Sequence, residues 1–356
     1  MTERWHNFSA GPSALALPVR EKLAEELAPA PDGRPSVAEI SHRGKRFTAL
    51  AEELEARLRD LMGVGGDHAV LLLPGGANLQ FAWLPMNLAA GVTPGYLISG
   101  HWGLKALAEA RRIGAAEVFG SSEEDGFRSL PAGDVPDHFA YLHYTGNETI
   151  HGLQFAAPPE SSVPLAADLS SEFLSRPYPY ADLGFAYAGA QKNLGIAGLT
   201  VVMIRRDLLE RIPDGLPRFL DFRTWVDSGS LYNTPATLAW YAALETLRWI
   251  EACGGLEAMA ERNRAKAAHL YDAIDRSAFY RNPVDNEARS VMNVPFWTEQ
   301  ESQVPLFVAE AEAAGLLGLK GHRALGGLRA SLYNALEMNA VDALVDFMRD
   351  FERRHG

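Results

Sequence analysis

The sequence contains one cysteine, Cys253, among its 356 residues. A single cysteine excludes an intramolecular disulfide and any zinc site built from several cysteines, and we expect no bound metal. Lysine is also scarce: only six of the 33 basic residues are lysines, so arginine is common and any single arginine is weak evidence of a site. No apolar run is long enough to span a bilayer, and the first residues contain no apolar core of signal-peptide length. We therefore expect a cytoplasmic protein.

Charge and composition limit the class of protein. With 47% hydrophobic and 22% charged residues, the chain has the composition of a globular protein rather than a disordered one. Its formal net charge of −12 argues against a general affinity for nucleic acid or an anionic membrane, although it is compatible with a local cationic pocket. The chain is longer than chains that usually form a single hydrophobic core, so we expect a large domain and a smaller one.

Short apolar runs alternate with helix-like segments through the first two thirds of the chain. The runs are uniformly apolar and bounded by Gly, Pro or polar turns, which is typical of buried strands: 69–73, 95–99, 139–143, 163–167 and 185–188. Helical patterns lie between them at 47–62, 81–90 and 104–113. The alternation predicts an α/β fold in which helices cover both faces of a mostly parallel sheet.

The last third of the chain has a different order. One helical pattern covers 235–252, and a second runs from about 256 to 274. Beyond them follow a strand, a helix, a strand and a helix, at 290–296, 304–314, 327–333 and 340–353, which together indicate a small open α+β layer. We expect a large domain over 16–258, a small C-terminal domain over 259–356, and an N-terminal segment (1–15) that packs with the small domain.

One of the six lysines, Lys192, stands among small residues between apolar runs at 184–188 and 199–204. Small neighbours leave the backbone exposed, so its amine could meet a carbonyl group and form a Schiff base. Asp168 ends an earlier predicted strand, where a carboxylate could keep a pyridine nitrogen protonated, so that the ring accepts electrons when a substrate Cα–H bond breaks. The pair points to a pyridoxal phosphate enzyme, although the segment after Asp168 is also compatible with a helix cap.

Three further segments follow predicted strands. Pro74-Gly-Gly-Ala-Asn78 leads into a helical pattern, where helix N-terminal N–H groups could close on a phosphate; a plain tight turn is the alternative. It matches neither of the nucleotide-binding glycine motifs. Trp102 could stack on a flat ring or simply belong to the core. Thr145-Gly-Asn-Glu-Thr149 could carry ligands or satisfy the backbone of a turn.

Two cationic clusters interrupt this acidic chain: Ser41-His-Arg-Gly-Lys-Arg46, and Lys320-Gly-His-Arg323 with Arg329 beyond it. Either cluster could be a solvated surface. Arg329, however, lies within an apolar strand pattern, where an unpaired guanidinium is costly, so we expect a carboxylate to pair with it. Two such clusters suit a substrate that carries two or three negative charges.

Nine short segments between residue 8 and residue 334, each present once, form a recognisable series. They are Phe8-Ser-Ala-Gly-Pro12, Ser41-His-Arg-Gly44, Gly75-Gly-Ala-Asn78, Asn147-Glu-Thr-Ile150, Ala167-Asp-Leu-Ser-Ser171, Tyr187-Ala-Gly-Ala-Gln-Lys-Asn193, Tyr232-Asn-Thr-Pro235, Met292-Asn-Val-Pro-Phe296, and Lys320-Gly-His-Arg323 with Arg329-Ala-Ser-Leu-Tyr-Asn334. In this order they resemble the phosphoserine aminotransferase family, which belongs to the class-V pyridoxal phosphate-dependent aminotransferases. The resemblance covers essentially the whole chain.

The resemblance implies a fold-type-I transferase whose large domain binds pyridoxal 5'-phosphate, and a homodimer with shared active sites. It implies a reversible ping-pong reaction in which O-phospho-L-serine and 2-oxoglutarate exchange an amino group with 3-phosphooxypyruvate and L-glutamate. This is a step of serine biosynthesis, and in many bacteria the same enzyme serves pyridoxine biosynthesis through 4-phosphohydroxy-L-threonine.

The resemblance also implies roles for individual residues. Lys192 forms the Schiff base and Asp168 pairs with the pyridinium, Trp102 stacks on the ring, and Thr149 approaches its phenolic oxygen. The cofactor phosphate is held by Ala77, Asn78 and Gln191 and, from the partner subunit, by Asn233 and Thr234. The substrate phosphate or distal carboxylate is received by His42, Arg43, His322 and Arg323, and the α-carboxylate by Arg329. Family members commonly carry Ser or Arg where Asn78 stands, so backbone contacts are expected at that position.

Other classes remain as alternatives. A different class-V aminotransferase is one; a cysteine desulfurase is another, but it needs an accessible nucleophilic cysteine, whereas Cys253 ends an apolar helical pattern. A binding or scaffold protein that kept the fold would be expected to lack Lys192 or Asp168. A nucleotide-dependent oxidoreductase would need a glycine fingerprint that the sequence does not contain.

Overall fold

The computed structural model describes residues 5–133 and 136–356. Within these residues the largest sheet has seven strands in the order β2-β10-β9-β8-β5-β3-β4. Only β10 runs antiparallel to its neighbours, so the predicted mostly parallel sheet is confirmed. In chain order the strands are β2 (His68–Leu73), β3 (Gly95–Ile98), β4 (Glu117–Ser121), β5 (Leu142–Thr145), β8 (Leu165–Asp168), β9 (Phe185–Gly189) and β10 (Thr200–Arg205).

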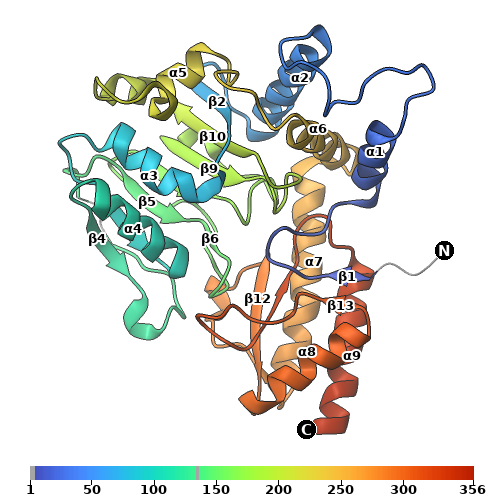
Figure 1. The fold of residues 1–356 in the computed structure, drawn as a ribbon. Helices are drawn as coiled ribbons and strands as arrows, with labels where there is room; N and C mark the ends of the chain where they lie inside the picture. The colour runs from blue at the N-terminus through green and yellow to red at the C-terminus, as the bar shows by residue number, and fades with distance from the viewer. Residues whose placement is uncertain (1–4, 134–135) are drawn as a thin grey trace.

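Helices pack on both faces of this sheet (Figure 1). They are α2 (Lys45–Met62), α3 (Gly76–Leu88), α4 (His101–Ile113), α5 (Phe222–Asp227) and α6 (Thr237–Ala252), and α1 (Leu17–Leu27) packs on α6. Side chains alternate along a strand, so Val70 and Leu72 of β2 join a core with α2 and α6, whereas Leu71 and Leu73 join a second core with α3 and α4. Every residue of β2 is buried, which explains why all of its residues after His68 are apolar.

The C-terminal part has a core of its own. It contains an antiparallel sheet of β11 (Tyr280–Arg281), β12 (Asn293–Thr298) and β14 (Leu328–Ser331), with helices α7 (Gly255–Arg276), α8 (Val304–Ala313) and α9 (Met338–His355). The long helix α7 joins the two parts: Met259 packs in the core of α2 and α6, whereas Leu270 packs in the C-terminal core. The predicted domain boundary after residue 258 falls in the first turn of α7, and the division into domains stays a prediction.

The N-terminal segment connects the C-terminal core to the loop that carries Lys192. Its strand β1 (His6–Asn7) pairs in parallel with β13 (Leu316–Leu317), and Phe8 is buried in the C-terminal core. Ser13 then donates its backbone N–H to the carbonyl of Gln191 at 3.0 Å and its hydroxyl to the carbonyl of Lys192. Residues 1–4 of the predicted segment lie outside the described residues.

Some elements begin elsewhere than predicted. Helix α3 begins at Gly76 rather than at 81, because Gly75 and Gly76 adopt φ values of +93° and +71° that let the strand turn directly into the helix. Helix α4 begins at His101 rather than at 104, so Trp102 stands in its first turn. The alternation pattern does not predict the short hairpin of β6 (Asn147–Glu148) and β7 (Leu153–Gln154). Among the described residues, no helix combines the length and the apolar character needed to cross a membrane.

Candidate active site

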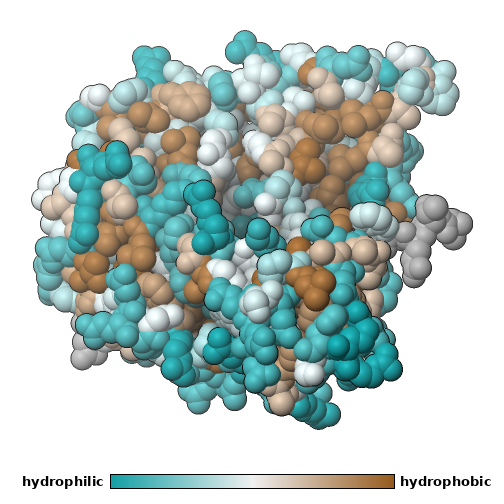
Figure 2. All heavy atoms as spheres, turned by 60° about the horizontal axis from the view of Figure 1, so that its bottom comes forward, coloured by the Kyte–Doolittle hydropathy of each residue, from teal (hydrophilic) through white to brown (hydrophobic). Residues whose placement is uncertain are grey.

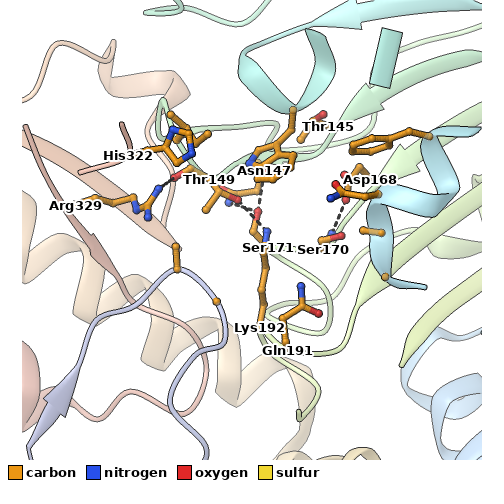
Figure 3. Close-up of a pocket in the computed structure, with 18 of the residues that line it drawn as sticks. Thr145, Asn147, Thr149, Asp168, Ser170, Ser171, Gln191, Lys192, His322 and Arg329 are labelled. Atoms are coloured by element: carbon orange, nitrogen blue, oxygen red, sulfur yellow. Dashed lines mark hydrogen bonds between the residues drawn. The ribbon is translucent and has the colours of Figure 1, made fainter. Parts of the chain in front are cut away.

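A cavity of about 320 Å³ lies at the carboxyl ends of the central strands, between the large sheet and the C-terminal part. This is where parallel α/β sheets place their ligands. Figure 3 shows Lys192 pointing into the cavity, with Asp168 on one side and His322 and Arg329 on the other. The surface is also hollowed near the middle of the face drawn in Figure 2. The lining residues are Ala10, Gly11, Gly75, Gly76, Ala77, Asn78, Phe81, Trp102, Thr145, Asn147, Thr149, Ile150, Asp168, Ser170, Ser171, Gln191, Lys192, His322 and Arg329.

Lys192 lies in the loop after β9, and its Nζ donates a 3.1 Å hydrogen bond to Oγ1 of Thr149. Burial lowers the pKa of Lys192 to about 8, although the nearby acidic groups of Asp168 and Glu148 act in the opposite direction. Near pH 8 a larger share of this amine is therefore neutral than in an ordinary lysine. A neutral amine is the form that attacks a carbonyl group.

Asp168 is the last residue of β8, and its carboxyl group is held in place from several sides. Its Oδ1 accepts the backbone N–H of Ser170 at 3.0 Å, and the hydroxyl of Tyr187 also bonds to it. That hydroxyl lies 2.9 Å from Nε2 of the buried His143. Burial raises the pKa of Asp168, whereas Lys192, Ser170 and Tyr187 act in the opposite direction. The result is an acid with a fixed orientation in the wall of the cavity.

The start of α3 forms the part of the wall that suits an anion. Gly76, Ala77 and Asn78 line the cavity there, and the first N–H groups of a helix have no partner within the helix. The aligned peptide dipoles add a partial positive charge at the same place. A side chain at Gly75 is excluded, since a Cβ would lie 2.3 Å from Cδ2 of Leu79. These features are compatible with an anion site at the start of α3, and the phosphate contacts of Ala77 and Asn78 stay a prediction.

Trp102 places an indole ring next to the reactive lysine. Nζ of Lys192 lies 5.8 Å from the centroid of the indole ring. The centroids of the Phe81 and Trp102 rings are 6.5 Å apart, and the two rings are tilted by 48°. The indole Nε1 is buried and has no hydrogen-bond partner among the described residues. A flat, partly apolar surface is therefore available on the cavity side of Lys192.

Arg329 of β14 supplies positive charge from the C-terminal part. Its Nη1 donates to the carbonyl oxygen of Thr149 at 3.5 Å, while its buried Nε has no hydrogen-bond partner in the described chain. Within residues 5–133 and 136–356 no carboxylate forms an ion pair with Arg329, so the pairing expected from the sequence is not seen there. Burial lowers the pKa of Arg329 against the opposing effects of Tyr333 and Glu148. An anionic ligand would satisfy this guanidinium.

His322 extends the same cationic edge. Its ring centroid lies 5.4 Å from that of His101, and burial together with His101, Arg329 and Arg323 lowers the pKa of His322. Every charged group that shifts it is cationic. An anion bound at this edge would reverse that shift and favour the protonated histidine.

Nine of the fourteen predicted site residues line the cavity, and five do not. Arg323 is exposed beside His322. His42 and Arg43 lie in the turn before α2, and Asn233 and Thr234 lie in the segment before α6. All five have exposed or partly exposed side chains. The single chain thus assembles the centre of the predicted site but not these outer groups.

The structure adds residues that the sequence analysis does not assign. Ala10 and Gly11 come from the N-terminus, and nothing in the local sequence indicates that they reach Lys192. Ser170 and Ser171 follow Asp168 directly, so the motif around Asp168 is the signal for them. Asn147 is a structural member of the wall: its Nδ2 donates to Ser171 at 2.7 Å and to Asn293 at 2.8 Å.

Comparisons with known proteins agree with this geometry. The family model described as "Aminotransferase class-V" matches residues 5–344. The chain is 48% identical to a phosphoserine aminotransferase of Geobacillus kaustophilus over 99% of both chains, and 47% identical to one of Azotobacter vinelandii over the full length of both. Among solved structures, the phosphoserine aminotransferase from Bacillus circulans subsp. alkalophilus matches with a TM-score of 0.97 and 46% identity, covering all of both chains. The PLP-bound phosphoserine aminotransferase from Trichomonas vaginalis matches with a TM-score of 0.90 and 38% identity, covering 97% of this chain and all of that one.

Proposed function

The chain belongs to the class-V aminotransferase family, and on that premise we propose that it has phosphoserine aminotransferase activity. It would exchange an amino group reversibly between O-phospho-L-serine with 2-oxoglutarate and 3-phosphooxypyruvate with L-glutamate. The observation that carries this proposal is one cavity with Lys192 and Asp168 on one side and the unpaired Arg329 with His322 on the other. An amino acid with an α-carboxylate and a second anionic group satisfies both sides.

The cavity residues fit pyridoxal phosphate at each of its chemical groups. The N-terminus of α3 offers N–H groups to the phosphate, Lys192 offers an amine to the aldehyde, and Asp168 offers a carboxylate to the ring nitrogen. Trp102 offers its indole to the ring face, and Thr149 offers a hydroxyl to the ring oxygen. When bound, pyridoxal phosphate supplies an electron sink for bond breaking at the substrate Cα.

The chain's own residues then move and hold protons. With the cofactor bound, Nζ of Lys192 would act as the general base that takes the Cα proton of the substrate and would deliver it to the cofactor carbon that bears the substrate nitrogen. The lowered pKa of Lys192, about 8, suits both directions because the amine gains and loses a proton near neutral pH. Asp168 holds a proton at the ring nitrogen, and the Ser170 and Tyr187 bonds keep its carboxylate aligned.

Arg329 and His322 determine which substrates are held in the reacting position. The guanidinium can bind the α-carboxylate through a pair of parallel hydrogen bonds. His322, with Arg323 beside it, faces the distal end of the substrate, where either a phosphate or the γ-carboxylate of glutamate can bind, since arginine accepts both anions in the same geometry. One site therefore serves both halves of a ping-pong reaction.

We further propose a homodimer that completes the site, and a cytoplasmic location. Asn233 and Thr234 were assigned to the partner's cofactor phosphate, and their place outside the cavity of their own chain is compatible with that role. His42 and Arg43 also lie outside it, so their predicted role in binding the substrate phosphate requires a second chain. Broad apolar patches are visible on the face drawn in Figure 2, and Tyr232, next to Asn233, is 40% exposed.

An absorbance experiment tests the proposal. The purified protein should show the visible absorbance of a Schiff base with pyridoxal phosphate. L-Glutamate should remove this absorbance and 3-phosphooxypyruvate should restore it, whereas alanine should leave it unchanged. Bleaching by alanine or by another amino donor, with no response to phosphooxypyruvate, would instead identify a different class-V aminotransferase.

A further inference from the structure

Glu148 is a fully buried carboxyl group beside the cavity, and the proposed mechanism gives it no role. Its Oε2 accepts the backbone N–H of Trp102 at 3.0 Å, and its Oε1 accepts the backbone N–H of Ile150 at 3.3 Å. Between Glu148 and Ile150 stands Thr149, whose hydroxyl accepts the hydrogen bond of Lys192. The Glu148 carboxyl group therefore links the backbone at Trp102 to the segment that contains Thr149, the hydrogen-bond partner of Lys192.

The contact with Trp102 closes the N-terminus of α4. The residue before this helix is Gly100, which has no side chain to bond the free N–H groups of the first turn, and Glu148 supplies that acceptor from a different strand. Gly100 also makes room for it, because a Cβ there would lie 2.4 Å from Cγ and 2.7 Å from Cδ of Glu148. Glu148 can therefore reach the N-terminus of α4 only because residue 100 has no side chain.

The indole of Trp102 packs against the core of α3 and α4, but no polar contact among the described residues sets its direction. Its Nε1 has no partner among the described residues, and the nearest aromatic rings, those of His101 and Phe81, lie 5.7 and 6.5 Å away at tilted or edge-on angles. The direction of the ring therefore depends on this packing and on the backbone of the first turn of α4. That backbone is held by the Glu148 carboxyl group.

We propose that Glu148 is a positioning residue, which holds the Trp102 indole in the plane that the pyridoxal phosphate ring contacts and in register with Thr149 and Lys192. The inference rests on the proposed function, since it concerns the ring of that cofactor. Its action is geometric: the Trp102 N–H needs an oxygen acceptor at a fixed reach, which a neutral carboxyl group or an amide also provides. An amide gives up only the longer, 3.3 Å bond to the Ile150 N–H.

The electrostatics of Glu148 favour this geometric role over a role as a counter-charge. Burial raises the pKa of Glu148 to about 8, against the lowering effects of the Trp102 and Ile150 N–H groups and of Lys192. A carboxyl group that is largely protonated at neutral pH adds little negative charge beside Lys192. Its hydrogen-bond reach to Trp102 is unaffected by that proton.

Two substitutions of Glu148 distinguish the effect of its side-chain length from the effect of its charge. Glu148→Gln keeps the length and removes the charge, whereas Glu148→Asp keeps the charge and withdraws the carboxyl group by one methylene. Apoprotein would be titrated with pyridoxal phosphate, and both the dissociation constant and the visible circular dichroism of the bound chromophore would be measured. We expect Glu148→Asp to weaken binding about tenfold, the size expected when one buried N–H group loses its acceptor, and to reduce the dichroism, while Glu148→Gln stays within about twofold.

Glu172 provides a matched control. It is also a buried glutamate, but its carboxyl group bonds Gln154 and Arg176 rather than Trp102. Glu172→Asp should lower the thermal stability like any disturbed buried acid and leave the dichroism of the bound chromophore unchanged. If Glu148→Gln weakens binding as much as Glu148→Asp, or if neither differs from wild type, the positioning role is wrong.

A double-mutant cycle with Trp102→Phe shows whether Glu148 acts through the indole. In the Trp102→Phe background, Glu148→Asp should change the dissociation constant by less than about twofold. An undiminished tenfold effect there would overturn the proposal. If Glu148→Asp does not fold, Glu148→Ala replaces it, because it removes both acceptor oxygens and should weaken binding at least as much. Failure of the wild-type protein to bind pyridoxal phosphate would count against the proposed function instead.

Discussion

The amine of Lys192 donates a hydrogen bond to the hydroxyl of Thr149 at 3.1 Å, although the two residues are 43 positions apart. The carbonyl oxygen of the same threonine accepts a hydrogen bond from Arg329, 180 positions further along the chain. Thr149 therefore stands between the reactive amine and the guanidinium proposed to hold the substrate. Three distant parts of the sequence converge on one residue, which ties the chemistry of the site to its recognition of anions.

Lys192→Ala should abolish both the Schiff-base absorbance and transamination. The rate should fall by at least about 10²-fold, because the substitution removes two functions at once: the amine that bonds to the cofactor and the general base. Absorbance spectra and a coupled assay of glutamate release would measure it. Lys105→Ala is the control: Nζ of Lys105 lies 5.2 Å from the centroid of the same indole, but it does not line the cavity. A yellow, active Lys192→Ala protein would contradict the assignment.

Arg329→Ala should weaken the binding of both amino acids. A charge-assisted hydrogen bond contributes about 1.5 to 3 kcal/mol, so the KM for glutamate and for phosphoserine should rise by about ten- to a hundredfold. Steady-state kinetics with each donor would show it, with Arg281→Ala, an exposed position in β11, as the control. An unchanged KM for glutamate would count against the role of Arg329.

The rate at which apoprotein forms a Schiff base with pyridoxal phosphate should rise with pH and level off above about 8. Burial lowers the pKa of Lys192 to about 8, and only the neutral amine attacks the aldehyde. The charge of Asp168 raises the pKa of Lys192, so Asp168→Asn should move the midpoint of this profile to lower pH. Stopped-flow absorbance over a pH series measures both profiles. A midpoint that remains near the value of a free lysine would show that Lys192 is not desolvated.

The sequence predicts the fold class and the centre of the site for identifiable physical reasons. Strands buried on both faces are uniformly apolar, as β2 is after His68, and small residues around Lys192 mark a loop. The contributions of Ala10 and Gly11 could not be predicted, since they depend on the long-range bonds between Ser13 and the Lys192 loop. The alternation of apolar runs and helical segments also does not reveal that β10 runs antiparallel to its neighbours, because a strand buried on both faces has the same composition in either direction.

Lys266→Met should destabilise the C-terminal part. Nζ of this buried lysine donates to the carbonyl oxygens of Leu332, Tyr333 and Leu336 at 2.8 to 3.0 Å, and methionine would leave all three without that donor. The carbonyl of Tyr333 keeps its bond from the N–H of Leu336, so two of the three acceptors depend on the lysine. At roughly 1 to 3 kcal/mol for each unsatisfied buried group, the loss should be about 2 kcal/mol or more. Urea unfolding of the apoprotein would measure it. Arg262→Met, at an exposed position of the same helix, is the control, and a loss below about 1 kcal/mol would show that water replaces the ammonium.

A mixture of two inactive chains should regain activity if the active sites are shared between subunits. One chain carries Lys192→Ala and the other carries Asn233→Ala with Thr234→Ala, and both are assayed at limiting pyridoxal phosphate. In the heterodimer, one site combines all the substitutions and the other combines none, because each site takes its lysine from one chain and its phosphate contacts from the partner. Random pairing makes about half of the dimers mixed, with one intact site each, so about a quarter of the wild-type activity should return. If Asn233 and Thr234 serve their own chain, every site keeps a defect and co-expression restores nothing. Light scattering on the same samples would show whether mixed dimers form, so that absence of activity in a confirmed heterodimer would refute the shared site.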